Sequence, residues 1–171
     1  AFRKVERHLF TLERHRHLAY KDQPLPIGEG QTISQPYIVA FMTELADITS
    51  EEKVLEVGTG SGYQAAILGE LAKSVYTIEI VRPLGERATE LLDELGYDNV
   101  HVRIGDGYAG WPEVAPFDAI LVAAAAPEVP PPLVEQLAED GRIIIPIGQP
   151  ARPQYLTLLR KANGQLRRQP V

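Results

Sequence analysis

The sequence has no cysteine, and it has only one methionine and one tryptophan among its 171 residues. Without cysteine there is no disulfide framework, no Cys-ligated zinc site and no cysteine nucleophile. No apolar run approaches the ~20 residues that cross a membrane, and no basic-then-apolar leader opens the chain. With 44% hydrophobic and 23% charged residues, the composition is that of an ordinary globular protein. We therefore expect a single cytoplasmic domain over residues 1–171, without membrane contact.

Basic residues are scarce in the middle of the chain. Residues 18–151 hold seven Lys or Arg against 21 Asp or Glu, whereas residues 1–17 and 152–171 hold five basic residues each. Because a duplex-binding face needs a basic stripe to contact phosphates, the acidic body predicts no nucleic-acid partner. Basic runs such as those in 1–17 and 152–171 are typical of solvated surface, and contact of these segments with a polyanion is the alternative. The N-terminal histidines have no metal-ligand partners in this pattern, so we expect no metal site: His8, His15 and His17.

Strands and helices alternate from Pro36 onward. Pro36 and the apolar spacing after it predict the start of a helix. Further helices are expected after the glycine-rich segment through Leu71, over 82–95 and over 132–137. The expected strands are 53–57, 74–80, 100–104, 117–122, 141–146 and 155–161, with a returning strand that begins at 165. This alternation predicts an α/β fold with a doubly wound, mostly parallel sheet. Because the sequence ends at Val171, it leaves open whether the last antiparallel strand is lacking.

The segment ahead of this core has a different character. Residues 1–12 resemble the tail of a helix that leads into a loop. Residues 18–36 are rich in Pro and Gly, and their X-Pro steps and Gly-Glu-Gly sequence predict no regular structure. A loop this long in a compact domain is typical of functional segments. The domain therefore divides into an N-terminal part, 1–36, and a core, 37–171.

A glycine-rich loop follows the first strand of the core. Gly58, Gly60 and Gly62 have the spacing G-x-G-x-G, whereas dinucleotide-binding loops have G-x-G-x-x-G. Closely spaced glycines let a ligand approach the backbone, and the helix N-terminus that follows offers N–H groups to an anion. Glu56 is poorly placed beside a phosphate but well placed to bind an ammonium group. A ligand with both an amino group and a carboxylate fits, and the methionine part of S-adenosylmethionine has both.

Two more strand ends carry acids. Glu79 closes the second strand, where a carboxylate can accept hydrogen bonds from a ribose diol. Asp106, with Gly107, closes the third strand, and its carboxylate and backbone suit the edge of an adenine. Taken alone, each acid fits a solvated strand end or a turn. Together with the glycine loop, in this order, they favour a nucleoside-bearing ligand.

These segments are similar to class I methyltransferases, and the connector narrows the resemblance to the protein-L-isoaspartate O-methyltransferases. The matching runs are VERHLF (5–10), LPIGEGQTISQPYIVAFMTELA (25–46), LEVGTGSGYQAAIL (55–68), YTIEI (76–80), GDG (105–107), FDAILVAAAAPEVP (117–130) and GRIIIPIG (141–148). The resemblance implies a Rossmann-like fold and an enzyme that needs S-adenosylmethionine and yields S-adenosylhomocysteine. It also implies protein repair, in which the free α-carboxylate of L-isoaspartyl residues in damaged proteins and peptides is methylated.

The resemblance also assigns roles to residues. It implies Ser34 as the active-site serine, and we expect its hydroxyl to donate a hydrogen bond to the substrate carboxylate rather than to act as a nucleophile. The alternative is that Ser34 caps the helix that starts at Pro36. The Ala123–Pro127 segment is expected to border the methyl-transfer centre, and Tyr63 either packs on the cofactor or within its helix. The implied cofactor-binding residues are Thr32, Ile33, Glu56, Gly58, Thr59, Gly60, Ser61, Gly62, Glu79, Asp106 and Gly107.

Two alternatives remain at this point, a non-catalytic adaptor that binds S-adenosylmethionine and a nicotinamide-dependent oxidoreductase. The oxidoreductase is considered because fold alone does not fix the chemistry. The G-x-G-x-G spacing and Glu56 count against it. We expect a monomer whose partners are isoaspartyl proteins and peptides. Relative to the family, the sequence lacks a helical segment before residue 5 and a strand and tail after Pro170, which leaves part of the cofactor pocket in question.

Overall fold

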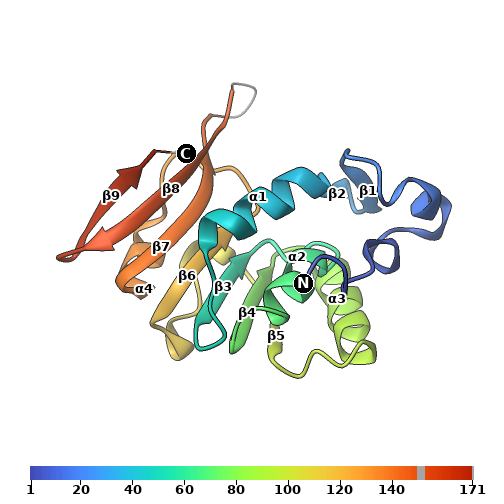
Figure 1. The fold of residues 1–171 in the computed structure, drawn as a ribbon, viewed down its shortest axis with the longest axis horizontal. Helices are drawn as coiled ribbons and strands as arrows, with labels where there is room; N and C mark the ends of the chain where they lie inside the picture. Colours follow the sequence, from blue (N-terminus) through green and yellow to red (C-terminus); the bar gives the residue numbers. More distant parts are fainter. Residues whose placement is uncertain (150–152, 171) are drawn as a thin grey trace.

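A seven-stranded sheet with the order β5-β4-β3-β6-β7-β8-β9 forms the centre of the molecule (Figure 1). The computed structural model describes residues 1–149 and 153–170. The first five strands in this order, β5, β4, β3, β6 and β7, are parallel to one another, and β8 and β9 each run antiparallel to the preceding strand. The strands are β3 Lys53–Val57, β4 Ser74–Glu79, β5 Val100–Ile104, β6 Phe117–Val122, β7 Leu137–Ile147, β8 Tyr155–Ala162 and β9 Gln165–Gln169. The expected α/β fold with a mostly parallel sheet is confirmed.

The direction of strand addition reverses at the middle of this sheet. From β3 the chain adds β4 and β5 on one side, and then β6 and β7 on the other. Ligands of open α/β sheets bind beyond the carboxyl ends of the strands at such a reversal. The topology therefore places a ligand site beyond the ends of β3 and β6.

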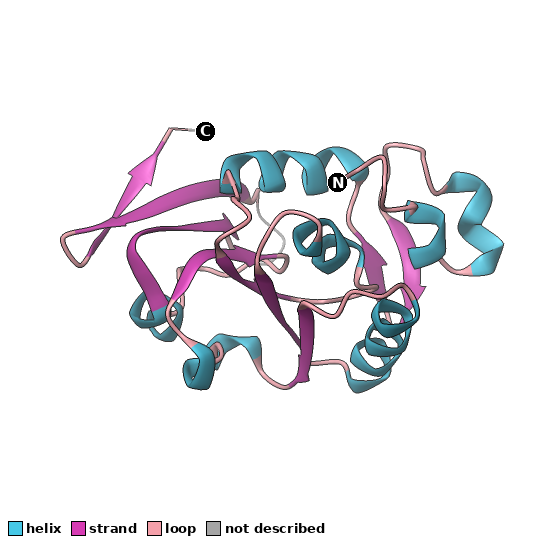
Figure 2. Cartoon of the chain, turned by 60° about the horizontal axis from the view of Figure 1, so that its bottom comes forward, coloured by secondary structure: helices cyan, strands magenta, loops and turns pink. Residues whose placement is uncertain are grey.

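Helices cover the two faces of the sheet unequally (Figures 1 and 2). Val54 and Leu55 are both fully buried, but they belong to different core clusters, because successive strand residues point to opposite faces. The first face carries α1 Pro36–Ala46, α2 Tyr63–Gly69 and α3 Arg82–Glu94, and the second carries α4 Pro131–Gln136 with the 3-10 helices η3 Gly107–Ala109 and η4 Pro112–Val114. Within residues 1–149 and 153–170, no helix has the length and apolarity of a membrane span.

The connector 18–36 contains a hairpin, so the expectation of no regular structure there is wrong. Strand β1 (Leu25–Gly28) pairs antiparallel with β2 (Gln31–Ile33). The Gly-Glu-Gly sequence makes the turn, with φ of 95° at Gly28, 53° at Glu29 and 71° at Gly30. Glycine adopts this left-handed conformation without steric cost, and proline is tolerated where its missing N–H faces no partner. The hairpin is held against the core by three buried side chains, Leu25, Ile27 and Ile33.

Other boundaries differ from the expected ones. The N-terminal segment forms two 3-10 helices, η1 (Arg7–Phe10) and η2 (Glu13–Leu18), where the tail of a helix was expected. Helix α2 ends at Gly69, before Leu71. Strand β7 begins at Leu137 because a bulge in its pairing with β6 lets it include four residues ahead of Gly141. The returning strand β9 is present and pairs with the second half of β8, and Val171 lies outside the described residues.

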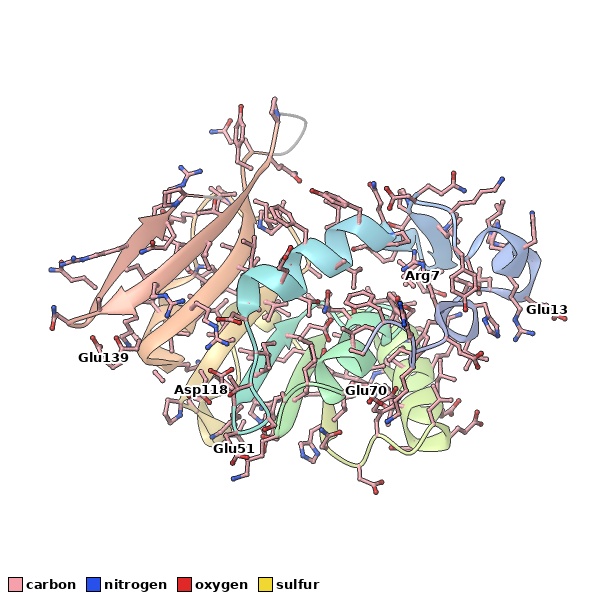
Figure 3. All side chains as sticks on the ribbon, in the orientation of Figure 1. Arg7, Glu13, Glu51, Glu70, Asp118 and Glu139 are labelled. Atoms are coloured by element: carbon pink, nitrogen blue, oxygen red, sulfur yellow. The ribbon has the colours of Figure 1, made fainter. Side chains whose placement is uncertain are left out.

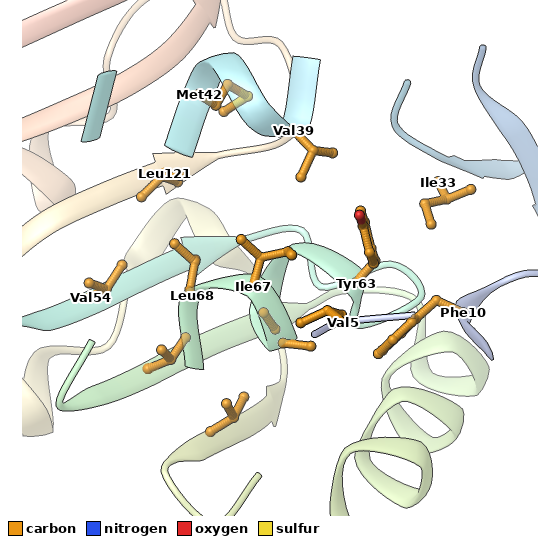
Figure 4. Packing of buried hydrophobic residues seen from close by; sticks show 14 of the residues in the cluster. Val5, Phe10, Ile33, Val39, Met42, Val54, Tyr63, Ile67, Leu68 and Leu121 are labelled. Atoms are coloured by element: carbon orange, nitrogen blue, oxygen red, sulfur yellow. The ribbon is translucent and has the colours of Figure 1, made fainter. Parts of the chain in front are cut away.

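The N-terminal segment packs beside the glycine-rich loop. Val5 and Phe10 are buried, and the Phe10 ring meets the Tyr63 ring edge-on at 5.5 Å between centroids. Figure 4 shows both side chains near Tyr63, the first residue of α2, with Ile33 of β2 to one side. The segment before the hairpin is thereby part of the core that supports the ligand end of the sheet.

Candidate functional site

A pocket of about 470 Å³ lies where the topology predicts a ligand site. This volume is in the range of small-molecule and cofactor sites. The lining comes from segments far apart in sequence: Gln31–Ser34, Val39, Met42, Glu56–Ser61, Tyr63, Gln64, Ile78–Val81, Asp106–Tyr108, Leu121–Ala126, Pro130 and Leu133. The pocket therefore joins the hairpin, helix α1 and the carboxyl ends of four parallel strands.

The glycine-rich loop forms one wall through its backbone. Gly58, Gly60 and Gly62 all have positive φ, of 98°, 55° and 86°, which explains why glycine alternates here. Gly62 lies outside the lining, although its neighbours line the pocket. A side chain at this position would instead meet Leu92 and Ala88 of α3. These contacts are of ordinary length, so the positive φ of Gly62 is what requires glycine there. The other four loop residues that we expected in the site, Gly58 to Ser61, line the pocket.

Glu56 is a fully buried carboxylate with unused hydrogen-bonding capacity. Its Oε2 accepts a hydrogen bond from the Thr77 hydroxyl at 2.6 Å, and the Thr77 and Thr59 hydroxyls are 2.7 Å apart. Its Oε1 has no hydrogen-bond partner among the described residues. Burial raises the pKa of Glu56 to about 8, with a smaller contribution in the same direction from the charge of Glu79 and an opposing one from the Thr77 hydrogen bond. A buried acceptor left without a partner is costly, so this oxygen calls for a donor from a ligand.

Glu79 and Asp106 are held by backbone N–H groups. Glu79 is 5% exposed and accepts from Gly60 N at 2.7 Å and from Val81 N at 2.9 Å, one bond to each carboxylate oxygen. Asp106 is exposed, and its Oδ1 accepts from Tyr108 N at 2.9 Å. Because each carboxylate oxygen can accept a further hydrogen bond, both side chains are fixed in place and still able to bind donors of a ligand.

Ser34 does not cap helix α1. The residue at the cap is Gln35, which makes no capping bond, and Asp22 instead accepts from Tyr37 N at 2.9 Å with one oxygen and from Gln35 Nε2 at 2.8 Å with the other. The Ser34 hydroxyl makes no hydrogen bond to any described residue, whereas the Ser34 carbonyl accepts one from Arg7. The half-buried hydroxyl is therefore available to a ligand in the pocket.

The remaining expected residues divide between lining and support. Thr32 is exposed and Ile33 is 4% exposed, and both line the pocket next to Ser34. Ala123 to Ala126 line the wall beyond β6, but Pro127 does not. Tyr63 contributes to the lining while its ring packs against Phe10 of η1, so packing on the cofactor stays a prediction.

Sequence reasoning missed several lining residues, such as Gln31, Gln64 and Tyr108, and also two polar residues that lie behind the lining. Thr77 is paired in register with Glu56 and lies two residues before Glu79 on β4. The two-residue period of a strand could have found it, since Thr77 and Glu79 point to one face. Arg7 contacts Ser34 and Tyr63 from behind the lining, and nothing in the local pattern signals this contact.

The lining is acidic. Among the described residues it contains Glu56, Glu79 and Asp106 and no Lys, Arg or His. Such a pocket favours a ligand with cationic and hydroxyl donor groups, and it does not by itself attract an anion.

A sequence model of the protein-L-isoaspartate(D-aspartate) O-methyltransferase family matches residues 1–171. The chain is 62% identical over 161 residues to protein-L-isoaspartate O-methyltransferase 1 of Nitrosospira multiformis, covering 94% of this chain and 68% of that protein. It is 60% identical to the protein-L-isoaspartate O-methyltransferase of Opitutus terrae, covering 96% of this chain and 71% of the other.

Two solved structures are also similar. A protein-L-isoaspartate O-methyltransferase superposes with a TM-score of 0.90 at 33% identity, over 96% of this chain and 55% of that one. A putative protein-L-isoaspartate O-methyltransferase from Plasmodium falciparum, in complex with S-adenosyl-L-homocysteine, superposes with a TM-score of 0.80 at 29% identity. This match covers 96% of this chain and 81% of that one. The chain thus spans about half the length of the first of these structures. The match confirms the resemblance drawn from the motifs.

Proposed function

The chain belongs to the protein-L-isoaspartate(D-aspartate) O-methyltransferase family, and we propose that it methylates the free α-carboxylate of L-isoaspartyl residues in damaged proteins and peptides, with S-adenosylmethionine as the methyl donor. The observation that carries this proposal is that one pocket contains both the serine expected to bind the substrate and the residues expected to bind the cofactor. The free Ser34 hydroxyl lies in the same lining as the glycine loop and the three acids.

The lining fits the cofactor. The Glu56 oxygen without a partner suits an ammonium group, and Glu79 retains acceptor capacity for a ribose diol. Asp106 and Gly107 lie at the end of β5, next to Tyr108 in the lining, where an adenine edge would meet them. The complex of the Plasmodium falciparum relative with S-adenosyl-L-homocysteine supports the same ligand here. Bound in this pocket, S-adenosylmethionine would supply an electrophilic methyl group and leave S-adenosylhomocysteine.

The residues of this chain then have little proton chemistry to perform. The substrate carboxylate, with an ordinary pKa near 4, is ionised at neutral pH and needs no general base. Ser34 holds one carboxylate oxygen through its hydroxyl, and the apolar Ala123–Ala126 wall borders the same space. The rate would come mainly from alignment of the reacting atoms, which contributes up to ~7–11 kcal/mol in well-oriented reactions.

The proposal also covers how the chain works as a unit. We propose a single methyltransferase domain that acts as a monomer on isoaspartyl proteins and peptides. It needs no nucleic acid, membrane or metal for this chemistry, and a cytoplasmic location is part of the same proposal.

A peptide pair tests the function. The protein is incubated with S-adenosylmethionine labelled in the methyl group and with two peptides that differ only in Asp or L-isoAsp at one position. We expect label in the isoaspartyl peptide alone, released as methanol on mild base treatment, because methyl esters hydrolyse. Equal labelling or none contradicts the proposal. Calorimetric binding of S-adenosylhomocysteine without any labelling would instead favour a non-catalytic adaptor.

A further inference from the structure

The acidic lining leaves one requirement of the proposed reaction unexplained. The substrate group is an anion, yet the described lining contains no cationic side chain. The nearest candidate lies one layer behind the lining. Arg7 of η1 is 1% exposed, and its Nη2 donates to the Ser34 carbonyl at 2.8 Å. Figure 3 labels Arg7 where the N-terminal segment meets the β1–β2 hairpin.

Arg7 joins three segments at once. Its Nε donates to the carbonyl of the fully buried Ala19 at 2.8 Å, which fixes the end of η2. Its guanidinium carbon lies 4.9 Å from the centre of the Tyr63 ring, at the start of α2. Since Ser34 and Tyr63 both line the pocket, the guanidinium is packed directly against the back of two lining residues.

The charge of Arg7 is not neutralised by an ion pair. None of the ion pairs formed between described residues includes it, so the charge of Asp22 acts on it only from beyond ion-pair distance. The buried Nη1 of Arg7 has no hydrogen-bond partner among the described residues. Burial of an uncompensated charge is expensive unless another interaction compensates it. A low-dielectric position next to the pocket also lets the charge act on a ligand with little screening.

We propose that Arg7 is a positioning residue for the methyl transfer, which holds the Ser34 main chain through its forked guanidinium and supplies the positive charge that favours a substrate carboxylate over an uncharged group. This inference rests on the proposed function. The forked geometry serves the first role, because two carbonyls on different segments are bound by one rigid planar group. The lack of a direct ion pair serves the second, because the Asp22 charge acts on Arg7 only from beyond ion-pair distance.

Arg87 offers a matched control. Its Nη2 donates to the Ile27 carbonyl at 2.7 Å, so it also holds the backbone of the hairpin, but it does not contact Ser34 or Tyr63. The test compares Arg7→Met, Arg7→Lys and Arg87→Met in the full chain. Each variant is measured for melting temperature, for S-adenosylhomocysteine affinity and for kcat/KM with the isoaspartyl peptide. Binding of that peptide is also compared with binding of its isoasparaginyl analogue, in which a neutral amide replaces the carboxylate.

We expect Arg7→Met to lower kcat/KM for the isoaspartyl peptide by about 10- to 100-fold, the loss typical of misplaced reacting groups. Its preference for the carboxylate over the amide should shrink by at least about fivefold, the effect of one lost charge on an anionic ligand. Affinity for S-adenosylhomocysteine should stay within about threefold, because none of its expected contacts involves Arg7. Arg7→Lys should keep the carboxylate preference and lose turnover, and Arg87→Met should keep both.

Three outcomes overturn the inference. One is an unchanged carboxylate preference in Arg7→Met, and another is an equal loss of all activities in Arg7→Met and Arg87→Met, which a purely structural role predicts. If Arg7→Met does not fold, the test depends on Arg7→Lys. The third outcome that overturns the inference is then a wild-type kcat/KM in Arg7→Lys. A wild-type chain that neither binds nor methylates the isoaspartyl peptide refutes the proposed function itself. A wild-type chain that methylates it while Arg7 proves neutral refutes only the role of Arg7.

Discussion

The hydroxyl of Ser34 and Oε1 of Glu56 lie in the pocket lining, and both have hydrogen-bonding capacity that no described residue uses. One is a neutral donor and the other a buried acceptor, so they suit opposite kinds of ligand group. Ser34 suits an anion and Glu56 a cation. Changes at these two positions should therefore affect substrate and cofactor separately.

Replacement of Ser34 by alanine should reduce turnover more than cofactor affinity. A hydrogen bond to a charged group is worth about 1.5–3 kcal/mol, so kcat/KM for an isoaspartyl peptide should fall about 10- to 150-fold. The melting temperature should stay near the wild-type value, because Asp22 caps helix α1. Steady-state kinetics and calorimetry with S-adenosylhomocysteine measure both effects, with Ser74→Ala on β4 as a control remote from the lining. An unchanged rate would refute the role of Ser34.

Glu56 should couple cofactor binding to pH. Since its pKa is raised to about 8 in the fold, the carboxyl keeps its proton at neutral pH, and an ammonium ligand should expel that proton. Calorimetry of S-adenosylhomocysteine binding at pH 7, in buffers with different ionisation enthalpies, should show release of up to one proton. Glu56→Gln should abolish this release and weaken binding. The same proton count in both proteins would contradict the assignment.

The same group gives stability a definite pH dependence in the ligand-free protein. The unfolded chain loses the Glu56 proton near pH 4.5 and the folded chain near pH 8. The folded state thus binds more protons between these values, and the stability that Glu56 contributes at low pH is lost as pH rises toward 8. Glu79 is the other ionisable group that acts on it. Urea unfolding from pH 5 to 8 should show a smaller decline in Glu56→Gln than in the wild type.

The motif residues of the site were predictable because they follow one another along strand ends. Glu56, Glu79 and Asp106 lie at or just beyond the carboxyl ends of β3, β4 and β5, and parallel strands bring these ends to one edge. The supporting contacts were not predictable in this way. Arg7 and Ser34 are 27 residues apart, and Asp22 and Tyr37 are 15 apart, across a hairpin whose turn was interpreted as a break. Such contacts depend on the tertiary path of the connector, which no periodic pattern describes.

At the scale of elements, one arginine ties helix α1 to the sheet. Arg142 of β7 forms two hydrogen bonds with the Glu52 carboxylate, at 2.6 and 2.7 Å, and donates to the carbonyls of Ala46 and Asp47 at the end of α1. It is 5% exposed. The Arg142 guanidinium also holds the pKa of Glu52 below its usual value. This network fixes the C-terminal end of α1, the helix that begins two residues after Ser34.

Loss of Arg142 should destabilise the fold strongly. Arg142→Met removes one partner of a buried pair and leaves the carbonyls at the end of α1 without donors, at a cost of about 3–5 kcal/mol. Urea denaturation followed by circular dichroism measures this. Arg82→Met is the control, because Arg82 and Glu86 form an exposed pair one helical turn apart and such pairs contribute about 0.3–0.5 kcal/mol. Similar losses in the two variants would contradict the structural role of the network.

Element types followed from periodicity, and several element ends did not. Strands β5 and β6 have the expected bounds, since the alternating residues of β5 end at Gly105 and the mostly apolar run of β6 begins after Pro116. Strand β7 extends past its expected start because a bulge, with Asp140 at φ 62°, joins residues that looked like a loop. The N-terminal 3-10 helices are set by packing of Val5 and Phe10, and no local propensity distinguishes them from the end of an α-helix.

At the scale of the whole molecule, a net charge of −6 opposes an anionic substrate. The screening length falls from about 30 Å at 0.01 M salt to about 10 Å at 0.1 M, so long-range repulsion weakens over this interval. For an acidic isoaspartyl peptide, kcat/KM should therefore rise about two- to threefold between 10 and 150 mM NaCl, and for a basic peptide it should fall. Initial rates at fixed pH test this. Identical salt responses of the two peptides would contradict it.

The pocket lining begins at Gln31 and ends at Leu133, so no ligand contact set is complete until synthesis has passed Leu133. The nascent hairpin with Ser34 emerges long before the β6 wall that it faces. A ligand of this pocket can therefore recognise only chains whose two sheet halves have already assembled. In cells, cofactor occupancy would then report on folding quality, because at 100 times its Kd a ligand adds about 2.7 kcal/mol to the native state and nothing to a partly made chain.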